Sequence, residues 1–183
     1  PPANLQAVFM RMQRIDYAVG DTIIRQGDDG DYFYAIVQGR CLVNRETPLN
    51  REGIKLAELG MGDTFGEEAL ISESPRNATV TLLTYGKLTR LAKADFRSLL
   101  NEPLARKIKF AEAKKEVDAG QARWLDVRMP TEFAAAALAG SINIPLFMLR
   151  MKLNLLDINT RYIIVCDSGR RSSVAVFVLS QKG

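Results

Sequence analysis

The chain has 183 residues, of which 47% are hydrophobic and 25% are charged, and it carries 25 Lys and Arg against 21 Asp and Glu. The length fits one large or two small domains. The composition is that of a globular protein and excludes an intrinsically disordered chain. No apolar run reaches the roughly 20 residues that span a bilayer, and the absence of histidine excludes any His-dependent triad or His-ligated metal site.

The first hundred residues are predicted to form a helix followed by short strands. Apolar residues at helical spacing predict a helix over residues 4–13. From Tyr17 to Leu91, β-rich runs such as 22–24, 32–37 and 41–43 are separated by glycines. Glycine allows the positive φ of tight reversals, so this pattern favours an antiparallel sandwich, barrel or roll.

The second half has a different pattern. A helical stripe begins at Lys93 and is interrupted by Pro103, and a further helix is predicted over 104–119. Strands and helices then alternate, which implies βαβ units and a parallel sheet. The predicted strands are 124–127, 142–144 and 162–165, and the predicted helices are 131–137 with Thr131 as N-cap, 146–153 and 172–181. A domain boundary is therefore expected near residues 101–112.

Residues 65–79 combine groups that suit a nucleotide phosphate. Gly66 leads a short helical turn that carries Glu67, and Arg76 follows nine residues after that acid. Backbone N–H groups at a helix start bind anions, and a guanidinium can hold two phosphate oxygens. A carboxylate can accept hydrogen bonds from a ribose hydroxyl.

This segment resembles the phosphate cassette of cyclic-nucleotide-binding domains, F-G-E-x-A-L followed by P-R-x-A-T, and the resemblance covers about residues 4–100. It implies that Glu67 holds the ribose 2′-hydroxyl and that Arg76 pairs with the cyclic phosphate. It also implies that the Ala69 N–H donates to a phosphate oxygen and that Gly66 allows a close backbone approach.

Asn77 stands at a position that discriminates the base in some members of that family. Because no Thr or Ser hydroxyl is available there, we favour cAMP, with cGMP as the alternative. The resemblance further implies that residues 93–119 are both a lid over the nucleotide and a tether to the second domain.

Another possible function for a chain with this roll is that of a transcription factor. The α/β pattern after residue 100 argues against it, because it is unlike a recognition-helix unit.

The second motif is a cysteine loop. Cys166 directly follows the predicted strand 162–165 and begins the run C-D-S-G-R-R-S-S, which leads into the predicted helix over 172–181. Backbone N–H groups of such a loop favour the thiolate, Arg171 adds positive charge, and Gly169 permits the sharp turn. This cysteine can therefore act as a nucleophile without a histidine base.

This loop resembles C-x-x-G-x-R-S of the rhodanese family, and the upstream signatures D-V-R-x-x-x-E-F and G-x-x-N-I-P match from Asp126 to Pro145. The resemblance covers about residue 109 to the end. It implies that Cys166 takes a sulfane sulfur from a donor such as thiosulfate and passes it to a thiol or cyanide. The N–H groups from Ser168 to Ser172 are expected to cradle the persulfide. The C-x4-R spacing is shorter than the C-x5-R loop of related phosphatases.

The expected fold class is α+β overall: an antiparallel β-roll with flanking helices, then an α/β rhodanese-like domain with a parallel sheet that is truncated at its C-terminus. The expected domains are 1–103 for nucleotide binding, 104–111 as helical connector and 112–183 for the rhodanese-like part. An enzyme under cyclic-nucleotide control is favoured over a sensor whose rhodanese-like domain is a non-catalytic interaction surface.

The remaining expectations concern ligands and compartment. Cys41 and Cys166 lie far apart and no leader is recognised, which favours the reducing cytoplasm. No cofactor and no metal are expected beyond cAMP or cGMP as ligand. The expected partners are that nucleotide, a small sulfane-sulfur donor and a thiol acceptor, without nucleic acid or membrane, and a homodimer stays open. Residues 101–183 carry 13 basic and 8 acidic side chains, which fits an anionic ligand or a solvated surface.

Overall fold

The computed structural model describes residues 2–104 and 106–181. The chain divides into two compact units, Pro1–Pro103 and Leu104–Gly183. Within the described ranges, no helix has the length and apolar character needed to cross a membrane.

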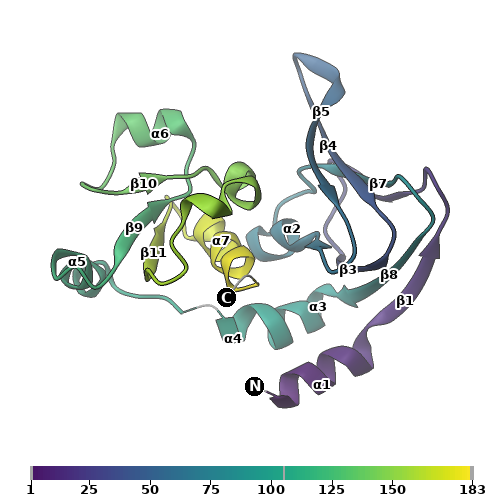
Figure 1. The fold of residues 1–183 in the computed structure, drawn as a ribbon, viewed down its shortest axis with the longest axis horizontal. Helices are drawn as coiled ribbons and strands as arrows, with labels where there is room; N and C mark the ends of the chain where they lie inside the picture. Colours follow the sequence, from purple (N-terminus) through teal and green to yellow (C-terminus); the bar gives the residue numbers. More distant parts are fainter. Residues whose placement is uncertain (1, 105, 182–183) are drawn as a thin grey trace. The chain divides into compact units, whose positions relative to one another are not determined.

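The first unit is an antiparallel roll. Its strands form two four-stranded sheets with the orders β1-β8-β3-β6 and β2-β7-β4-β5, and the β4–β5 hairpin projects from it (Figure 1). The elements are α1 (Pro2–Arg11), β1 (Gln13–Tyr17), β2 (Thr22–Ile24), β3 (Tyr32–Gln38), β4 (Cys41–Thr47), β5 (Asn50–Leu59), β6 (Thr64–Phe65), α2 (Glu67–Ser72), β7 (Thr79–Leu82) and β8 (Gly86–Ala92). The predicted antiparallel architecture is confirmed.

One apolar cluster joins the two sheets of this roll. Along β7 the residues alternate, so that Val80 and Leu82 are buried in the cluster whereas the threonines between them are half-buried. Tyr34 of β3 stacks on Phe65 of β6 with ring centroids 5.1 Å apart. Cys41 is fully buried in the same cluster, and this burial raises the pKa of its thiol to about 11.

The helical segment after the roll differs from the prediction. It consists of α3 (Lys93–Phe96), a π-helical turn η1 (Arg97–Asn101) and α4 (Glu102–Leu104), so Pro103 lies within its last turn and does not interrupt it. The predicted helix over 104–119 is confirmed over α5 (Phe110–Asp118) but not before it, because residues 106–109 are not helical. Arg106 and Lys109 would lie one turn apart on a continuous helix, where like charges repel.

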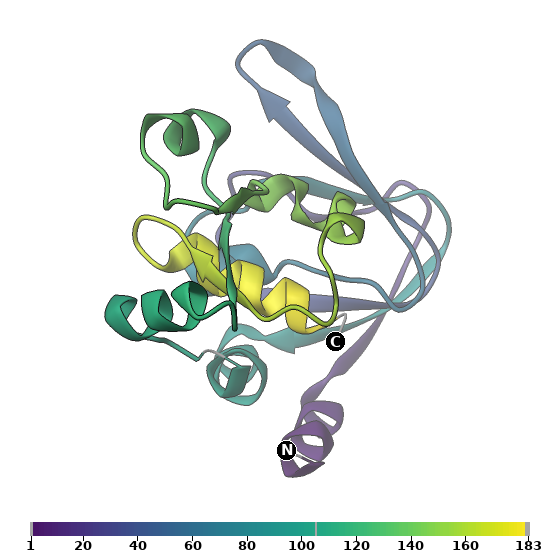
Figure 2. The ribbon, with the colours of Figure 1, turned by 60° about the vertical axis from the view of Figure 1, so that its left-hand side comes forward.

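The second unit has a three-stranded parallel sheet of order β10-β9-β11. Its elements after α5 are β9 (Arg123–Asp126), α6 (Pro130–Ala135), β10 (Ile142–Asn143), the 3-10 turns η2 (Leu146–Met151) and η3 (Leu153–Leu155), β11 (Tyr162–Val165) and α7 (Arg170–Ser180). Figures 1 and 2 show α7 lying against β11. The predicted parallel sheet is confirmed.

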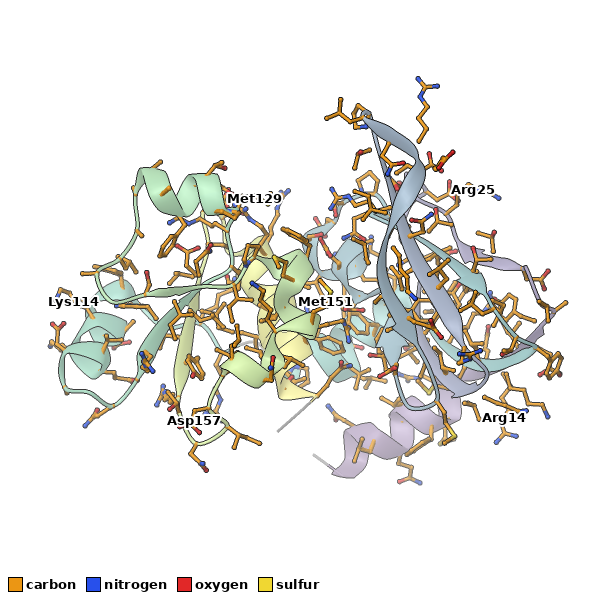
Figure 3. All side chains as sticks on the ribbon, turned by 45° about the horizontal axis from the view of Figure 1, so that its top comes forward. Arg14, Arg25, Lys114, Met129, Met151 and Asp157 are labelled. Carbon is orange, nitrogen blue, oxygen red and sulfur yellow. The ribbon has the colours of Figure 1, made fainter. Side chains whose placement is uncertain are left out.

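Two helix predictions in this unit need correction. Thr131 is not the N-cap of α6: the helix begins at Pro130 and Met129, labelled in Figure 3, is the N-cap. Proline holds the preceding residue extended and is tolerated at the first helical position, so the boundary falls before it. The predicted helix over 146–153 is instead two short 3-10 turns, a form that occurs in pieces of a few residues.

Candidate functional site

The phosphate cassette begins at a glycine that no other residue type replaces without strain. Gly66 has φ +89°, in the left-handed region that side chains with a Cβ rarely adopt. A Cβ at this position would lie 2.9 Å from the Arg76 Nη1 atom and 3.1 Å from the Tyr32 carbonyl oxygen. The bare backbone therefore lets Gly66 turn directly beside the Arg76 guanidinium.

The Arg76 guanidinium is held in place by the backbone. Nη1 donates to the Gly66 carbonyl at 2.6 Å, and Nη2 donates to the Tyr32 carbonyl at 2.7 Å and to Asp31 Oδ1 at 3.2 Å. The Arg76 side chain is 2% exposed, whereas that of Asp31 is 65% exposed. Since a buried charge is stable only when it is hydrogen-bonded, these contacts fix the orientation of the cation.

The other predicted cassette residues lie next to this pair in the chain. Glu67 and Ala69 are buried in α2, and the loop that contains Gly30 packs closely on that helix. A Cβ on Gly30 would lie 2.8 Å from the Ala69 Cβ. The loop around Gly30 therefore lies directly against the cassette helix α2.

The structure assigns Asn77 a partner that sequence reasoning missed. Its Nδ2 atom donates to Glu68 Oε2 at 2.6 Å. The bond ties the residue after Arg76 to the first turn of α2. The sequence gives little indication of this hydrogen bond, because Glu68 occupies the variable position of the cassette motif.

A second contact missed from the sequence links α2 to the helical segment after the roll. Arg97, in η1, donates to the Leu70 carbonyl through Nε at 3.1 Å and Nη2 at 3.0 Å, and its Nη2 also pairs with Glu73 Oε1. Leu70 and Glu73 lie at the C-terminal end of α2, where carbonyls lack helical partners. Arg97 therefore fastens η1 to the cassette helix.

The cysteine loop joins β11 to α7 as predicted. The Cys166 sulfur accepts hydrogen bonds from the N–H of Gly169 at 3.1 Å and from the N–H of Ser172 at 3.3 Å. It also donates to Ser172 Oγ at 3.4 Å. Gly169 is the N-cap of α7 and has φ +84°, so the turn depends on glycine. This arrangement is suited to a thiolate, which is the nucleophilic form of cysteine.

Arg171 does not stand as an isolated positive charge in this loop. Its guanidinium forms two hydrogen bonds to Glu132 of α6, at 2.6 and 2.8 Å, and an ion pair with Asp167 at 3.0 Å. These bonds lower the pKa of both carboxyls to about 2. Arg171 therefore ties α6 to the loop, with its charge shared between two acids.

Ser168 is exposed, and its backbone hydrogen-bonds the Asp167 carboxylate. Of the residues predicted to cradle a persulfide, Gly169 and Ser172 thus direct an N–H to Cys166. Within residues 2–104 and 106–181, no group of three or more Cys, Asp or Glu side chains is arranged to hold a metal ion.

Beneath the loop, Asp126 and Arg128 form a structural pair. Asp126 is fully buried at the end of β9, and its carboxylate accepts bonds from Arg128 Nε at 3.0 Å and Nη2 at 2.6 Å. The Arg128 Nη2 atom also donates to the Ala136 carbonyl at 2.6 Å. Asn143 of β10 donates to the carbonyls of both paired residues. These bonds hold the carboxyl end of the sheet, where Cys166 follows β11.

Two family models match the chain in succession. The model described as "Cyclic nucleotide-binding domain" matches residues 14–102, and the model described as "Rhodanese-like domain" matches residues 109–183.

Three known proteins are each similar to part of the chain. A cAMP-dependent protein kinase regulatory subunit of Dictyostelium discoideum is 39% identical over 90 residues, which are 48% of this chain and 28% of that protein. The cGMP-dependent protein kinase isozyme 1 of Drosophila melanogaster is 41% identical over 88 residues, 47% of this chain and 12% of that protein. The regulatory domain of Toxoplasma gondii PKA, solved with cAMP, has a TM-score of 0.53 at 26% identity and covers 64% of this chain and 43% of its own. The chain spans less than half the length of each of these three proteins.

Proposed function

The chain joins a cyclic nucleotide-binding domain to a rhodanese-like domain, and on this premise we propose that it is a cyclic-nucleotide sensor coupled to a sulfurtransferase that carries a persulfide on Cys166. The observation that carries the catalytic half is the cradle of two N–H groups at the Cys166 sulfur. We place the sensor at residues 1–103, the connector at 104–111 and the sulfurtransferase at 112–183, in the cytoplasm.

The proposed nucleotide site is built on the cassette. The buried Arg76 receives the cyclic phosphate, the Ala69 N–H donates to a phosphate oxygen, Glu67 accepts from the ribose and Gly66 provides the close approach. The orientation of Arg76 by the Gly66 and Tyr32 carbonyls supports this role. We favour cAMP as the ligand, as in the PKA regulatory domain solved with it, and cGMP is the alternative that the kinase relative suggests.

Calorimetric titration with cAMP and with cGMP tests this site. Arg76→Ala is expected to abolish binding, whereas Arg45→Ala, on an exposed residue of β4, is expected to leave it intact. Equal affinity in the two variants would remove Arg76 from the site. Because Asn77 is bonded to Glu68, Asn77→Ala is the variant that tests its role in the choice of base.

In the proposed sulfur transfer, the Cys166 thiolate attacks the sulfane sulfur of a donor such as thiosulfate. A bond forms between Sγ and that sulfur, the bond between the two donor sulfurs breaks, and its electron pair leaves with sulfite. The N–H groups of the Gly169–Ser172 loop stabilise the negative charge on sulfur. A thiol acceptor then takes the outer sulfur and restores the thiolate.

Mass spectrometry after incubation with thiosulfate tests the transfer. We expect a gain of about 32 Da, one sulfur atom, on Cys166 and its loss in Cys166→Ser. Cys41 serves as an internal control, because it is fully buried. Absence of the adduct with thiosulfate and with small persulfide donors would reject the enzymatic function.

A second function, a sensor with a non-catalytic rhodanese-like interaction domain, is favoured by one observation. Asp167 is ionised and 60% exposed beside Cys166, and it shares the charge of Arg171 with Glu132. Such a carboxylate repels an anionic donor. Nucleotide binding that is lost in Arg76→Ala, with no persulfide from any donor, would identify this function.

We further propose that the nucleotide controls the second domain through η1. The fastening of Arg97 to Leu70 and Glu73 supports this, because a shift of α2 on binding nucleotide is transmitted to η1 and so to the connector. A nucleotide can act only through different affinities for two states. Saturating nucleotide should therefore change the sulfur-transfer rate in the parent protein and fail to do so in Arg97→Ala. An unchanged rate in both would refute the coupling.

A further inference from the structure

The basic residues of the second unit are concentrated near its start. Residues 106–115 carry five Lys or Arg side chains and a single acidic one, Glu112. The five basic residues are all exposed: Arg106, Lys107, Lys109, Lys114 and Lys115. Within residues 2–104 and 106–181, Lys114 is the one of these five that forms an ion pair, with Asp118. This stretch therefore presents a local positive charge, which attracts polyanions.

Ile108 anchors the basic stretch to the second unit. Its side chain packs against the buried cluster that contains Trp124. Residues 106–109 are non-helical, and Lys109, the N-cap of α5, has the extended ψ of 143°. Lys107 and Lys109, on either side of Ile108, are exposed, as expected where side chains alternate along an extended backbone. An apolar contact thus holds these cations at the surface.

An aromatic ring lies within the same stretch. Phe110, the first residue of α5, is 58% exposed. Its ring stacks on that of Trp124, with centroids 5.9 Å apart and an interplanar angle of 13°. Trp124 is itself buried, so the protein supports the Phe110 ring from one side and leaves more than half of the residue open to solvent.

Cations flank this ring on both sides along the chain. Lys109 directly precedes Phe110, and Lys114, labelled in Figure 3, follows it by four residues of α5. Residues four apart are neighbours on the surface of a helix. The exposed part of the ring is therefore bordered by positive charge.

This combination distinguishes between classes of polyanion. A single-stranded nucleic acid offers phosphates to the cations and base faces that stack on an aromatic ring. An acidic polypeptide supplies the charge but has no general use for the ring. An anionic membrane surface binds through a large apolar helical face beside its cations, and one phenylalanine does not provide such a face.

We propose that residues 106–115 form a binding surface for single-stranded nucleic acid, in which the five Lys and Arg side chains contact phosphates and the exposed side of Phe110 stacks on a base. This surface departs from the sequence expectation of no nucleic acid partner, because contacts to phosphates and base faces need no recognition helix. It involves neither the phosphate cassette nor Cys166, so its test is independent of the function proposed above.

Fluorescence anisotropy of labelled oligonucleotides of about 12 nucleotides, titrated with the full chain, tests the role of the ring. Oligo-uridine and oligo-thymidine distinguish RNA from DNA as the ligand. Phe110→Ala should weaken binding about five- to hundredfold, the effect of losing one base stacked on an aromatic ring. Phe110→Tyr, which keeps the ring, should bind like the parent. Phe147→Ala is the matched control, because it removes another exposed ring of the same unit outside the basic stretch.

The salt dependence of the affinity tests the phosphate contacts. Lys107→Gln and Lys109→Gln should each reduce the slope of log affinity against log salt by about 0.7, the value for one phosphate of a single strand. Lys87→Gln, on an exposed residue of β8, should leave the slope unchanged. Bound oligonucleotide should also slow tryptic cleavage at Arg106, Lys107 and Lys109.

Several results would overturn the inference. Absence of binding at physiological ionic strength would identify a solvated surface. Equal affinity of Phe110→Ala and the parent, together with equal binding of poly-glutamate, would identify an acidic polypeptide as the ligand. Binding to phosphatidylserine vesicles without binding to oligonucleotides would identify an anionic membrane. If the thermal unfolding midpoint shows that Phe110→Ala has lost its fold, Phe110→Tyr and the salt slopes of the two lysine variants decide.

Discussion

Replacement of Gly66 by alanine should disturb the nucleotide site through one added carbon. An alanine at φ +89° costs about 1–2 kcal/mol in backbone strain. The new Cβ would also press on Arg76 Nη1 at 2.9 Å and on the Tyr32 carbonyl at 3.1 Å, and overpacking of this kind adds about 1–3 kcal/mol. We therefore expect the first unit to lose about 2–5 kcal/mol of stability and its affinity for cAMP to fall at least about tenfold.

Gly62 offers a control that separates the two effects. It has φ +88°, but among the described residues no atom lies within 4 Å of a Cβ placed on it. Gly62→Ala should therefore show only the backbone strain, about 1–2 kcal/mol, with cAMP affinity unchanged. Native-state hydrogen exchange of the β3 and β8 amides measures the stability of the roll, and calorimetry measures the affinity. Equal losses in the two variants would refute the contact between Gly66 and Arg76 as the cause.

Three further predictions concern the second unit and the connector. Asp126→Asn should destabilise the second unit by about 2–3 kcal/mol, because it breaks a buried ion pair; fluorescence of Trp124, the sole tryptophan, reports this unit. The carboxyls of Glu132 and Asp167 have folded pKa values of about 2, below the roughly 4 of unfolded chains, so their stabilisation is complete above about pH 5 and is lost as the pH falls towards 2. Unfolding followed at pH 7, 4 and 2 checks this loss. Limited trypsin digestion should cut first at Arg106, Lys107 or Lys109, which are exposed in a non-helical stretch, and mass spectrometry identifies the two fragments.

Each of these predictions has a result that would contradict it. Asp118→Asn is the control for Asp126→Asn, because it breaks an exposed ion pair that contributes about 0–1 kcal/mol to stability. Equal losses of stability in the two variants would exclude a special role for the buried pair. In Glu132→Gln the difference in stability between pH 7 and pH 2 should shrink; an unchanged difference would place the acid sensitivity elsewhere. A first tryptic cut inside the roll would contradict the proposed connector.

Local sequence determined much of the fold. The strands predicted at 22–24 and 162–165 have those bounds in the structure, because runs of β-branched and aromatic residues between turn residues favour extended backbone whatever surrounds them. Gly66 was predicted for a close backbone approach and Gly169 for a sharp turn, and in the structure both adopt the positive φ that glycine accepts without strain. The order of roll then α/β followed from the change of hydrophobic period.

Helix boundaries were less predictable, because they depend on partners as well as on spacing. The break at 106–109 and the 3-10 turns η2 and η3 occur in segments with apolar residues at helical intervals. Propensity alone favoured continuous helices there. Like charges at Arg106 and Lys109 oppose a continuous helix, and η2 contacts α7.

The partners of the functional side chains were decided by tertiary structure alone. Arg76 lies 44 residues from Tyr32, whose carbonyl it binds, and Arg171 lies 39 residues from Glu132. The motifs therefore determined which residues could bind an anion or a sulfur atom. Only the folded chain decided that Arg171 pairs with two carboxylates and that the Ser172 hydroxyl reaches Cys166. A hydrogen bond is made or lost by differences in distance of a few tenths of an ångström, and sequence spacing does not specify these.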